Sequence, residues 1–133
     1  MKYLLDTNTC IRYINGRAPK IYDYMRAVAD SDIAISTITQ AEMYAGSAKS
    51  QTPQQSRDKQ DNFFVRFRSL TFDEGAADAF GRIRAALESA GTPIGPYDMQ
   101  IGAIALVHNL ILVTHNVSEF QRIPVLQIED WEV

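Results

Sequence analysis

The sequence opens with Met1–Asn8, MKYLLDTN, in which a short apolar run stops abruptly at an aspartate. A run of this kind is typical of a buried strand, and polar residues after it can cap a helix. Thr7 and Asn8 offer such a cap for a helix that we expect to end near Gly16. The chain is therefore predicted to begin with a strand and a helix, and Asp6 marks the point where the strand ends.

The same alternation continues along the chain. Later helices are expected over 19–30, from Ser36 or Thr37 through Glu42, over 74–90 and over 96–109. Polar residues from 46 to 60 indicate an exposed loop or a pair of solvent-facing helices. Further strands are expected at 33–35, 70–72, 111–113 and 125–128. This order predicts an α/β fold with three α/β/α layers and a short, mostly parallel central sheet, whose strand order cannot be derived from it.

Composition limits the classes of protein that need consideration. The chain has 133 residues, of which 46% are hydrophobic, so we expect a single domain over 1–133. A net charge of −3 provides no overall basic field, so any contact with RNA or DNA has to be local.

Three further features bear on where the protein acts. Cys10 is the only cysteine and cannot form an internal disulfide. No apolar run approaches the ~20 residues of a membrane span. An aspartate at position 6 leaves no room for a signal peptide. We therefore expect a cytoplasmic protein with no membrane partner.

Four acidic residues lie far apart in the sequence, and each follows an expected strand or begins an expected helix. They are Asp6, Glu42, Asp98 and Glu119. Asp6 ends the first strand, Glu42 lies in the first turns after the second, and Glu119 closely follows the strand 111–113. In a parallel α/β sheet, the loops after the strands open on one edge, where such folds bind ligands. These three residues are therefore expected at that edge.

Asp98 reaches the same edge by a different route. It lies at the start of the expected helix 96–109, which a tight turn joins to the strand 111–113. The turn makes the helix antiparallel to the strand, so the helix begins beside the end of the strand. All four carboxylates are thus predicted to converge.

A cluster of carboxylates indicates a metal site, because like charges at short range repel one another and raise each other's pKa values. Oxygen ligands without a histidine or cysteine pair favour Mg²⁺ or Mn²⁺ over zinc. Such an ion activates water and stabilises charge on a phosphodiester. Metal-assisted phosphodiester hydrolysis is the chemistry that this pattern predicts.

Each acid also has an ordinary structural interpretation, and Asp6 could simply end a strand. Glu42 could complete a capping box with Thr39, and Asn116 with Glu119 is another cap-and-third-residue pair. Asp98 stands where a helix dipole favours any anion. Taken singly these interpretations are as good as a site, but four such residues facing one edge favour a site.

At these residues the chain resembles PIN-domain ribonucleases and, more narrowly, the VapC toxins of type II VapBC toxin–antitoxin systems. The resemblance runs from end to end. Four segments carry it, each containing one of the acids: 1–8 (MKYLLDTN), 35–42 (ISTITQAE), 94–101 (IGPYDMQI) and 113–120 (VTHNVSEF).

The resemblance implies a Mg²⁺-dependent endoribonuclease, with Mn²⁺ as a substitute, that is inhibited by a VapB-type antitoxin and forms a homodimer or a hetero-oligomer with that antitoxin. Its RNA substrate would be a tRNA, with the anticodon stem-loop of initiator tRNA as one candidate. Asp6 and Asp98 would bind the metal, and Glu42 and Glu119 would act directly or through water. Supporting residues would hydrogen-bond the carboxylates or the scissile phosphate; these are Thr7, Asn8, Thr114 and Asn116.

Two other functions remain open. A haloacid-dehalogenase-like Mg²⁺ phosphatase would need a second aspartate at position 8, where this chain has Asn8. A non-catalytic PIN-like nucleic-acid-binding module would usually have lost part of the acid set, which here is filled.

Basic residues and one histidine complete the candidates. The first group could offer a local positive surface to phosphates, or simply a solvated helix face; it comprises Arg57, Lys59, Arg66 and Arg68. His115 could act as a general acid, although a metal-bound water does not require one.

Overall fold

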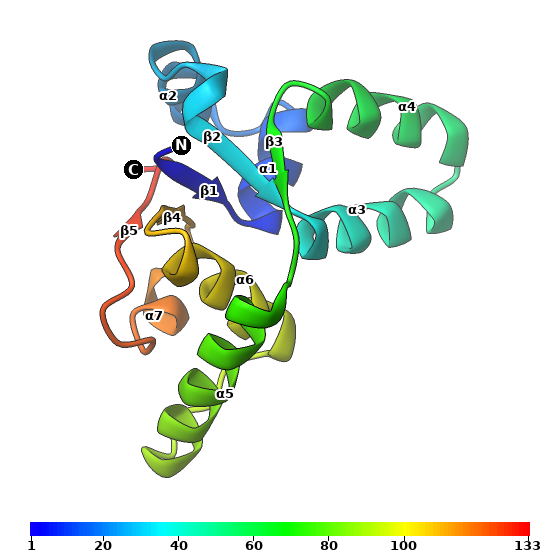
Figure 1. Ribbon diagram of the computed structural model, residues 1–133. Helices are drawn as coiled ribbons and strands as arrows, with labels where there is room; N and C mark the ends of the chain where they lie inside the picture. Colours follow the sequence, from blue (N-terminus) through cyan, green and yellow to red (C-terminus); the bar gives the residue numbers. More distant parts are fainter.

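The computed structural model describes residues 1–133 and is built around one five-stranded sheet (Figure 1). Its strand order is β3-β2-β1-β4-β5, and every neighbouring pair is parallel. The predicted mostly parallel sheet is therefore confirmed, and no strand runs against the others. The strands are β1 (Tyr3–Leu5), β2 (Ile33–Ser36), β3 (Arg68–Leu70), β4 (Ile111–Val113) and β5 (Ile128–Glu129).

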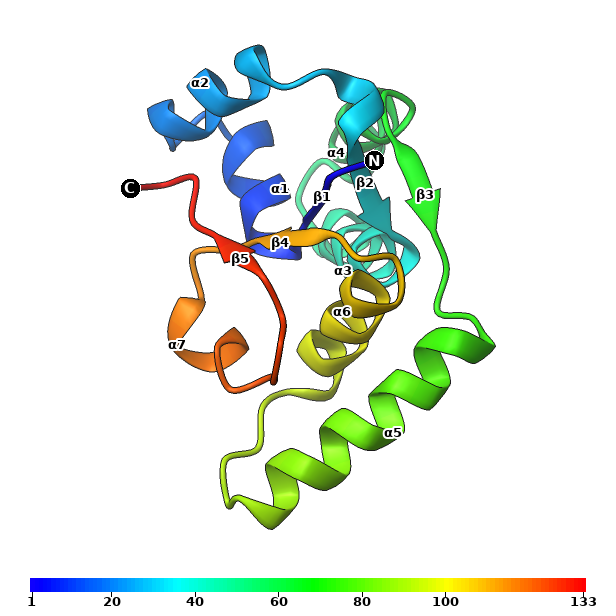
Figure 2. The same cartoon turned by 60° about the vertical axis from the view of Figure 1, so that its left-hand side comes forward.

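Seven α-helices and a short 3₁₀ turn at Asp30–Asp32 connect the strands. Figure 2 shows α1 on one side of β1 and β4 and α6 on the other, which gives the three predicted layers. None of these helices has the length and apolar character needed to cross a membrane. The helices are α1 (Thr7–Ile14), α2 (Pro19–Ala27), α3 (Thr37–Lys49), α4 (Pro53–Phe64), α5 (Glu74–Ser89), α6 (Pro96–Val107) and α7 (Val117–Phe120).

The sheet is buried on both faces because successive side chains of a strand point to opposite sides. Leu4 contributes to a core shared with α5, α6 and α7, together with Ala34 and Leu112 of the neighbouring strands. Leu5 and Val113 contribute to a second core shared with α1, α2, α3 and α4. Two cores on one three-residue strand hold β1 at the centre of the molecule.

The strand order reverses direction at β1. The chain continues from β1 to β2 on one side of it, whereas β4 lies on the other side. Ligands of open α/β sheets bind outside the carboxyl ends of the strands at such a reversal of strand order. Asp6 and Thr114 follow the two strands that flank this point.

The turn between α6 and β4 has the geometry expected from the sequence. Only residues 108–110 separate the two elements, and Asn109 adopts a left-handed backbone conformation with φ of 53°. Such a conformation is tolerated by asparagine and reverses the chain sharply. The first turn of α6 therefore lies at the carboxyl edge of the sheet.

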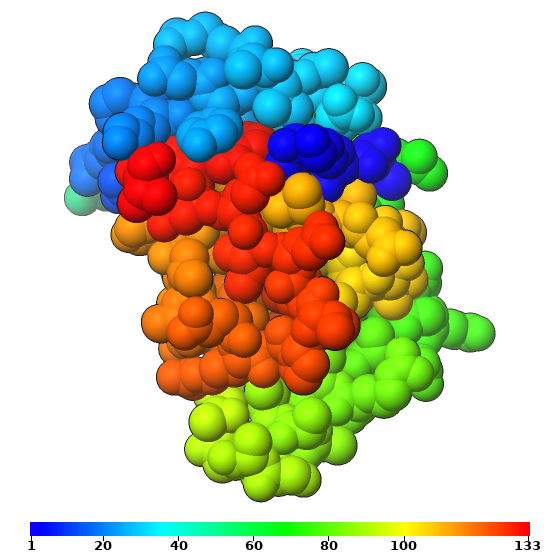
Figure 3. Space-filling model, turned by 90° about the vertical axis from the view of Figure 1, so that its left-hand side faces the viewer, coloured from blue at the N-terminus to red at the C-terminus, as the bar shows by residue number.

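The C-terminal segment is fixed to the body by Trp131. Its buried ring stacks on Tyr24 of α2, with ring centroids 5.0 Å apart, and meets the edge of Tyr3 of β1 at 5.1 Å. In Figure 3 the red C-terminal residues lie between the light-blue region of α2 and the orange segment that contains α7. The last residues of the chain thus lie beside the carboxyl edge of β4.

Several predicted boundaries were wrong, and most of these errors concern the two edge strands. β3 spans 68–70 rather than 70–72, and β5 spans 128–129 rather than 125–128. Arg68 and Ser69 are exposed, so β3 lacks the apolar run expected of a buried strand. The short helix α7 was not predicted, α2 ends at Ala27, and the polar segment 46–60 is the helix-pair alternative.

Substitution of two helical glycines by alanine is expected to have opposite effects on stability. A Cβ at Gly102 of α6 would lie 2.6 Å from Cδ1 of the buried Ile123, whereas a Cβ at Gly81 of α5 meets nothing within 4 Å. We expect Gly102→Ala to lower the free energy of unfolding by about 1–2 kcal/mol, and Gly81→Ala to raise it by about 0.5–1 kcal/mol. Urea denaturation of both variants measures this; equal effects would contradict the close packing of α6 on Ile123.

Candidate active site

Asp6 is buried at the end of β1 and both of its carboxylate oxygens accept hydrogen bonds. Oδ1 accepts from the backbone N–H of Thr9 at 2.8 Å, so Asp6 is itself the N-cap of α1, a role predicted for Thr7 or Asn8. Oδ2 accepts from the hydroxyl of Thr114 at 2.6 Å. Burial raises the pKa of Asp6, and the hydrogen bonds from Thr114 and Thr9 oppose that rise.

Glu42 faces the same edge from the second turn of α3. The Thr7 hydroxyl donates to Oε1 of Glu42 at 2.7 Å and lies 3.1 Å from the hydroxyl oxygen of Thr39. Ser36 caps α3 by accepting from the N–H of Thr39. Glu42 therefore has no part in capping, and the capping-box interpretation of this residue is wrong.

Asp98 lies in the first turn of α6, two residues after Pro96, and its carboxylate accepts no protein hydrogen bond. Its pKa is raised from the ordinary 3.8 to about 6, first by partial burial and then by the charges of Asp6, Glu119 and Glu42. The other three acids all act on this one carboxylate. The structure thus brings the four predicted residues into one electrostatic cluster at the carboxyl edge.

Glu119 is positioned by the four-residue helix α7. The side-chain amide of Asn116 donates to Oε2 of Glu119 at 2.8 Å, and the backbone N–H of Asn116 donates to the Thr114 hydroxyl at 3.0 Å. The Thr114 hydroxyl therefore contacts the carboxylate of Asp6 and the residue that holds Glu119. One side chain links the first and last acids of the chain.

Of the four predicted supporting residues, three contact the acids directly: Thr7, Thr114 and Asn116. Asn8 is exposed, and its side chain makes no hydrogen bond with them. Sequence reasoning considered Ser36 and Thr39 only as helix-starting residues and missed their place in the site, where their buried hydroxyl oxygens lie 3.3 Å apart and Thr39 contacts Thr7. The Ser-x-x-Thr spacing at the start of an expected helix was the signal for this pair.

The donor set fits a hydrated Mg²⁺ ion better than a closed metal cage. No group of three or more Asp, Glu, His or Cys side chains is arranged to hold an ion by itself. Mg²⁺ usually keeps several waters and binds through one or two carboxylates. Asp98 has both oxygens available, and the Asp6 carboxylate lies in the same cluster. The concentration of negative charge around Asp98 is what a divalent cation would neutralise.

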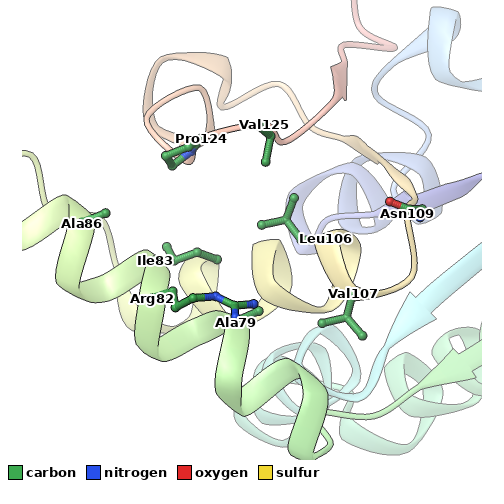
Figure 4. Close-up of a pocket in the computed structure, with 9 residues that line it drawn as sticks. All are labelled: Ala79, Arg82, Ile83, Ala86, Leu106, Val107, Asn109, Pro124 and Val125. Carbon is green, nitrogen blue, oxygen red and sulfur yellow. The ribbon is translucent and has the colours of Figure 1, made fainter.

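A mainly hydrophobic cavity lies apart from the acidic residues. It measures about 560 Å³ and lies between α5, the end of α6 and the loop containing Pro124 and Val125 (Figure 4). Six of its nine lining residues are hydrophobic, and none is acidic. It is at the opposite end of α6 from Asp98, so it is separate from the acidic cluster.

Comparison with known proteins places this geometry in context. Residues 3–126 match the family model of the PIN domain. The chain is 40% identical over 131 residues to the tRNA(fMet)-specific endonuclease VapC of Salmonella typhimurium, with 98% of each chain covered. It is 38% identical over 133 residues to ribonuclease VapC2 of Rickettsia felis, with 99% of each covered. Its structure is similar to a chain in the DNA-bound VapBC crystal structure from S. typhimurium, with a TM-score of 0.93, 40% identity and 98% of both chains covered.

Crowding of charge around Asp98 predicts a pH-dependent gain from removing it. A carboxyl whose pKa is raised by folding destabilises the folded state above that pKa, and the penalty disappears as the pH falls toward the unfolded value. Without added metal, Asp98→Asn should raise the free energy of unfolding by about 1–2 kcal/mol at pH 7, allowing for partial exposure. The difference from wild type should vanish by about pH 4.

Denaturation curves between these pH values measure the effect. Asp78→Asn is the matched control, since Asp78 forms an exposed ion pair with Arg82 on α5 and should change stability little. A variant at position 98 that is less stable than wild type at every pH would show that Asp98 mainly stabilises the start of α6.

Proposed function

The chain belongs to the PIN domain family and, within it, to the VapC ribonucleases, and we propose that it is the endoribonuclease toxin of a toxin–antitoxin system. The observation that carries this proposal is that hydroxyl and amide donors hold three of the four predicted acids at the carboxyl edge of the sheet. The proposed catalytic unit comprises the whole chain, 1–133, as one domain. Its activity is the hydrolysis of phosphodiester bonds in RNA.

Nucleases of this family generally depend on a divalent metal ion, and we propose that here it is Mg²⁺, with Mn²⁺ as a substitute. Asp6 and Asp98 would bind it, and Glu42 and Glu119 would act directly or through water. The ion supplies an activated water and stabilises charge on the phosphodiester.

The protein's own contribution is to hold the carboxylates in place. Thr7 orients Glu42, Thr114 orients Asp6, and the amide of Asn116 orients Glu119. Residues that fix metal-binding side chains in this way support affinity and activity. Asn8 is left with the second role expected of it, a hydrogen bond to the scissile phosphate.

A tRNA is the proposed substrate, and the anticodon stem-loop of initiator tRNA is the first candidate. The support is the 40% identity to a relative described as a tRNA(fMet)-specific endonuclease. A VapB-type antitoxin is the proposed inhibitor, because similar chains occur in solved VapBC complexes. We also propose that the protein acts in the cytoplasm as a homodimer or in a hetero-oligomer with its antitoxin.

The rival functions explain less of the site. A dehalogenase-like phosphatase needs an acid at position 8, where this chain has Asn8, an exposed residue whose side chain makes no hydrogen bond with the acids. A non-catalytic binding module does not require the hydroxyl and amide donors that hold the acidic side chains. Their presence favours catalysis.

Cleavage of RNA by the purified protein tests the activity. We expect purified tRNA to be cut with Mg²⁺ or Mn²⁺ present and left intact in excess EDTA, and gel electrophoresis with end-mapping measures both. Asp98→Asn should lower the rate by a factor of about 10³ or more, since it removes a metal ligand. The control Asp78→Asn should cut at the wild-type rate. Full activity in EDTA, or in the position-98 variant, would refute the metal mechanism.

Expression in bacteria tests the toxin role. The chain expressed alone should arrest growth, and co-expression of its cognate antitoxin or the Asp98→Asn change should restore it. Growth curves and immunoblots of the protein level measure this. Normal growth at a normal level of wild-type protein would favour the non-catalytic binding module.

A further inference from the structure

His115 is next in sequence to two residues of the acidic cluster but forms no hydrogen bond or ion pair with the four acids. It stands between Thr114, which binds Asp6, and Asn116, which binds Glu119. Its side chain is 59% exposed, and Nδ1 lies 2.8 Å from Oδ2 of Asp130. Nε2 has no protein partner, so it is available to a ligand at the surface.

Asp130 is itself held in a fixed position. Its Oδ1 accepts the backbone N–H of Glu132 at 2.9 Å, and its side chain is only 14% exposed. The neighbouring Trp131 is buried between Tyr3 and Tyr24, which anchors this segment to the body. Both oxygens of Asp130 are therefore engaged, and the imidazole is oriented by a rigid partner.

The surroundings of His115 favour its charged form. The hydrogen bond to Asp130 raises the pKa of His115, and the charges of Asp130 and Glu132 add to this. Exposure to solvent leaves little desolvation, which together with Arg12 has the opposite and smaller effect. Arg12 is paired with Glu132, so it offsets part of that carboxylate's influence. A larger fraction of His115 is thus protonated near neutral pH than of an ordinary histidine.

A positive charge at His115 would reduce the repulsion between RNA and the acidic cluster. RNA is a polyanion and must approach four carboxylates on a protein of net charge −3. Two of the four basic residues considered earlier already have acidic partners, because Arg57 pairs with Asp61 over the ring of Tyr44, and Arg66 pairs with Asp30. His115 instead combines a cationic ring with a free donor beside the acids.

Resting on the proposed function, we infer that His115, oriented by Asp130, binds a phosphate of the RNA backbone next to the scissile phosphodiester. Its protonated Nε2 donates to the phosphate oxygen while Nδ1 donates to Asp130, so both nitrogens are used. This contact strengthens substrate binding and leaves the rate of bond cleavage unchanged. It assigns to Asp130 the role of a positioning residue.

A purely structural role makes different predictions. The bond between His115 and Asp130 also ties the C-terminal segment to the loop after β4, and its loss would lower stability. It would not alter how RNA binding depends on pH or salt. Those two dependences therefore separate the two roles.

The experiment measures kcat and KM for purified tRNA, with Mg²⁺ present, from roughly pH 6 to 8. We expect His115→Ala to raise KM about fivefold at the acid end, with kcat within about twofold of wild type. KM of wild type should rise with pH as His115 loses its proton, whereas KM of His115→Ala should not. His115→Arg should restore a low KM without pH dependence, and Asp130→Asn should move the rise in KM to lower pH.

Binding without cleavage gives an independent measurement. Fluorescence anisotropy of labelled initiator tRNA in EDTA should show that His115→Ala reduces the slope of log Kd against log salt by about 0.7–0.9, the value of one phosphate contact. The chain has only one other histidine, His108, which follows α6 at the opposite edge of the sheet. His108→Ala is therefore the matched control and should bind as wild type does.

Each result decides between the roles. A fall in kcat with unchanged KM, or a fall in thermal stability with unchanged KM and salt slope, would overturn the inference. If His115→Ala fails to fold, the comparison of His115→Arg and Asp130→Asn with wild type carries the same test. Failure of the wild-type protein to cleave any tRNA would instead overturn the proposed function, and with it this inference.

Discussion

Repulsion between like charges is the constraint on which the site depends. Four carboxylates from distant parts of the chain meet at one edge of the sheet, where partial burial and then the charges of the other three raise the pKa of Asp98. A fold tolerates such crowding when donors oppose it, and Thr7, Thr114 and Asn116 each supply one. Asp98 alone has no donor. The uncompensated charge is thus concentrated at the position where a cation has the most to neutralise.

The rest of the fold serves to maintain this arrangement. β1 is buried by two separate cores, one on each face, so the strand that ends in Asp6 cannot shift without disturbing both. Close packing of this kind transmits small displacements rather than absorbing them. The short turn after α6 holds Asp98 against the same edge. The backbone that carries Asp6 and Asp98 is therefore held rigidly, although their carboxylates repel each other.

The buried strands and the positions of Asp6 and Asp98 could be predicted from the sequence, because local patterns determine them. Short apolar runs in a sequence indicate buried strands, and Asp6 ends the clearest of these runs. Asp98 could be placed because the turn between α6 and β4 is too short to allow any other orientation. Edge strands carry no such signal, since the exposed Arg68 and Ser69 look like a loop. The order of the strands and the contact of Thr7 with Glu42 depend on tertiary neighbours that local patterns do not encode.

The hydrogen bond between Thr114 and Asp6 joins residues separated by 108 positions. Synthesis proceeds from the N-terminus, so on the ribosome Asp6 emerges long before its partner and before the strand that supports the far side of β1. The acidic cluster can form only when nearly all of the chain has been translated. A nascent chain would therefore lack the assembled acidic cluster, which would form only once the chain has left the ribosome.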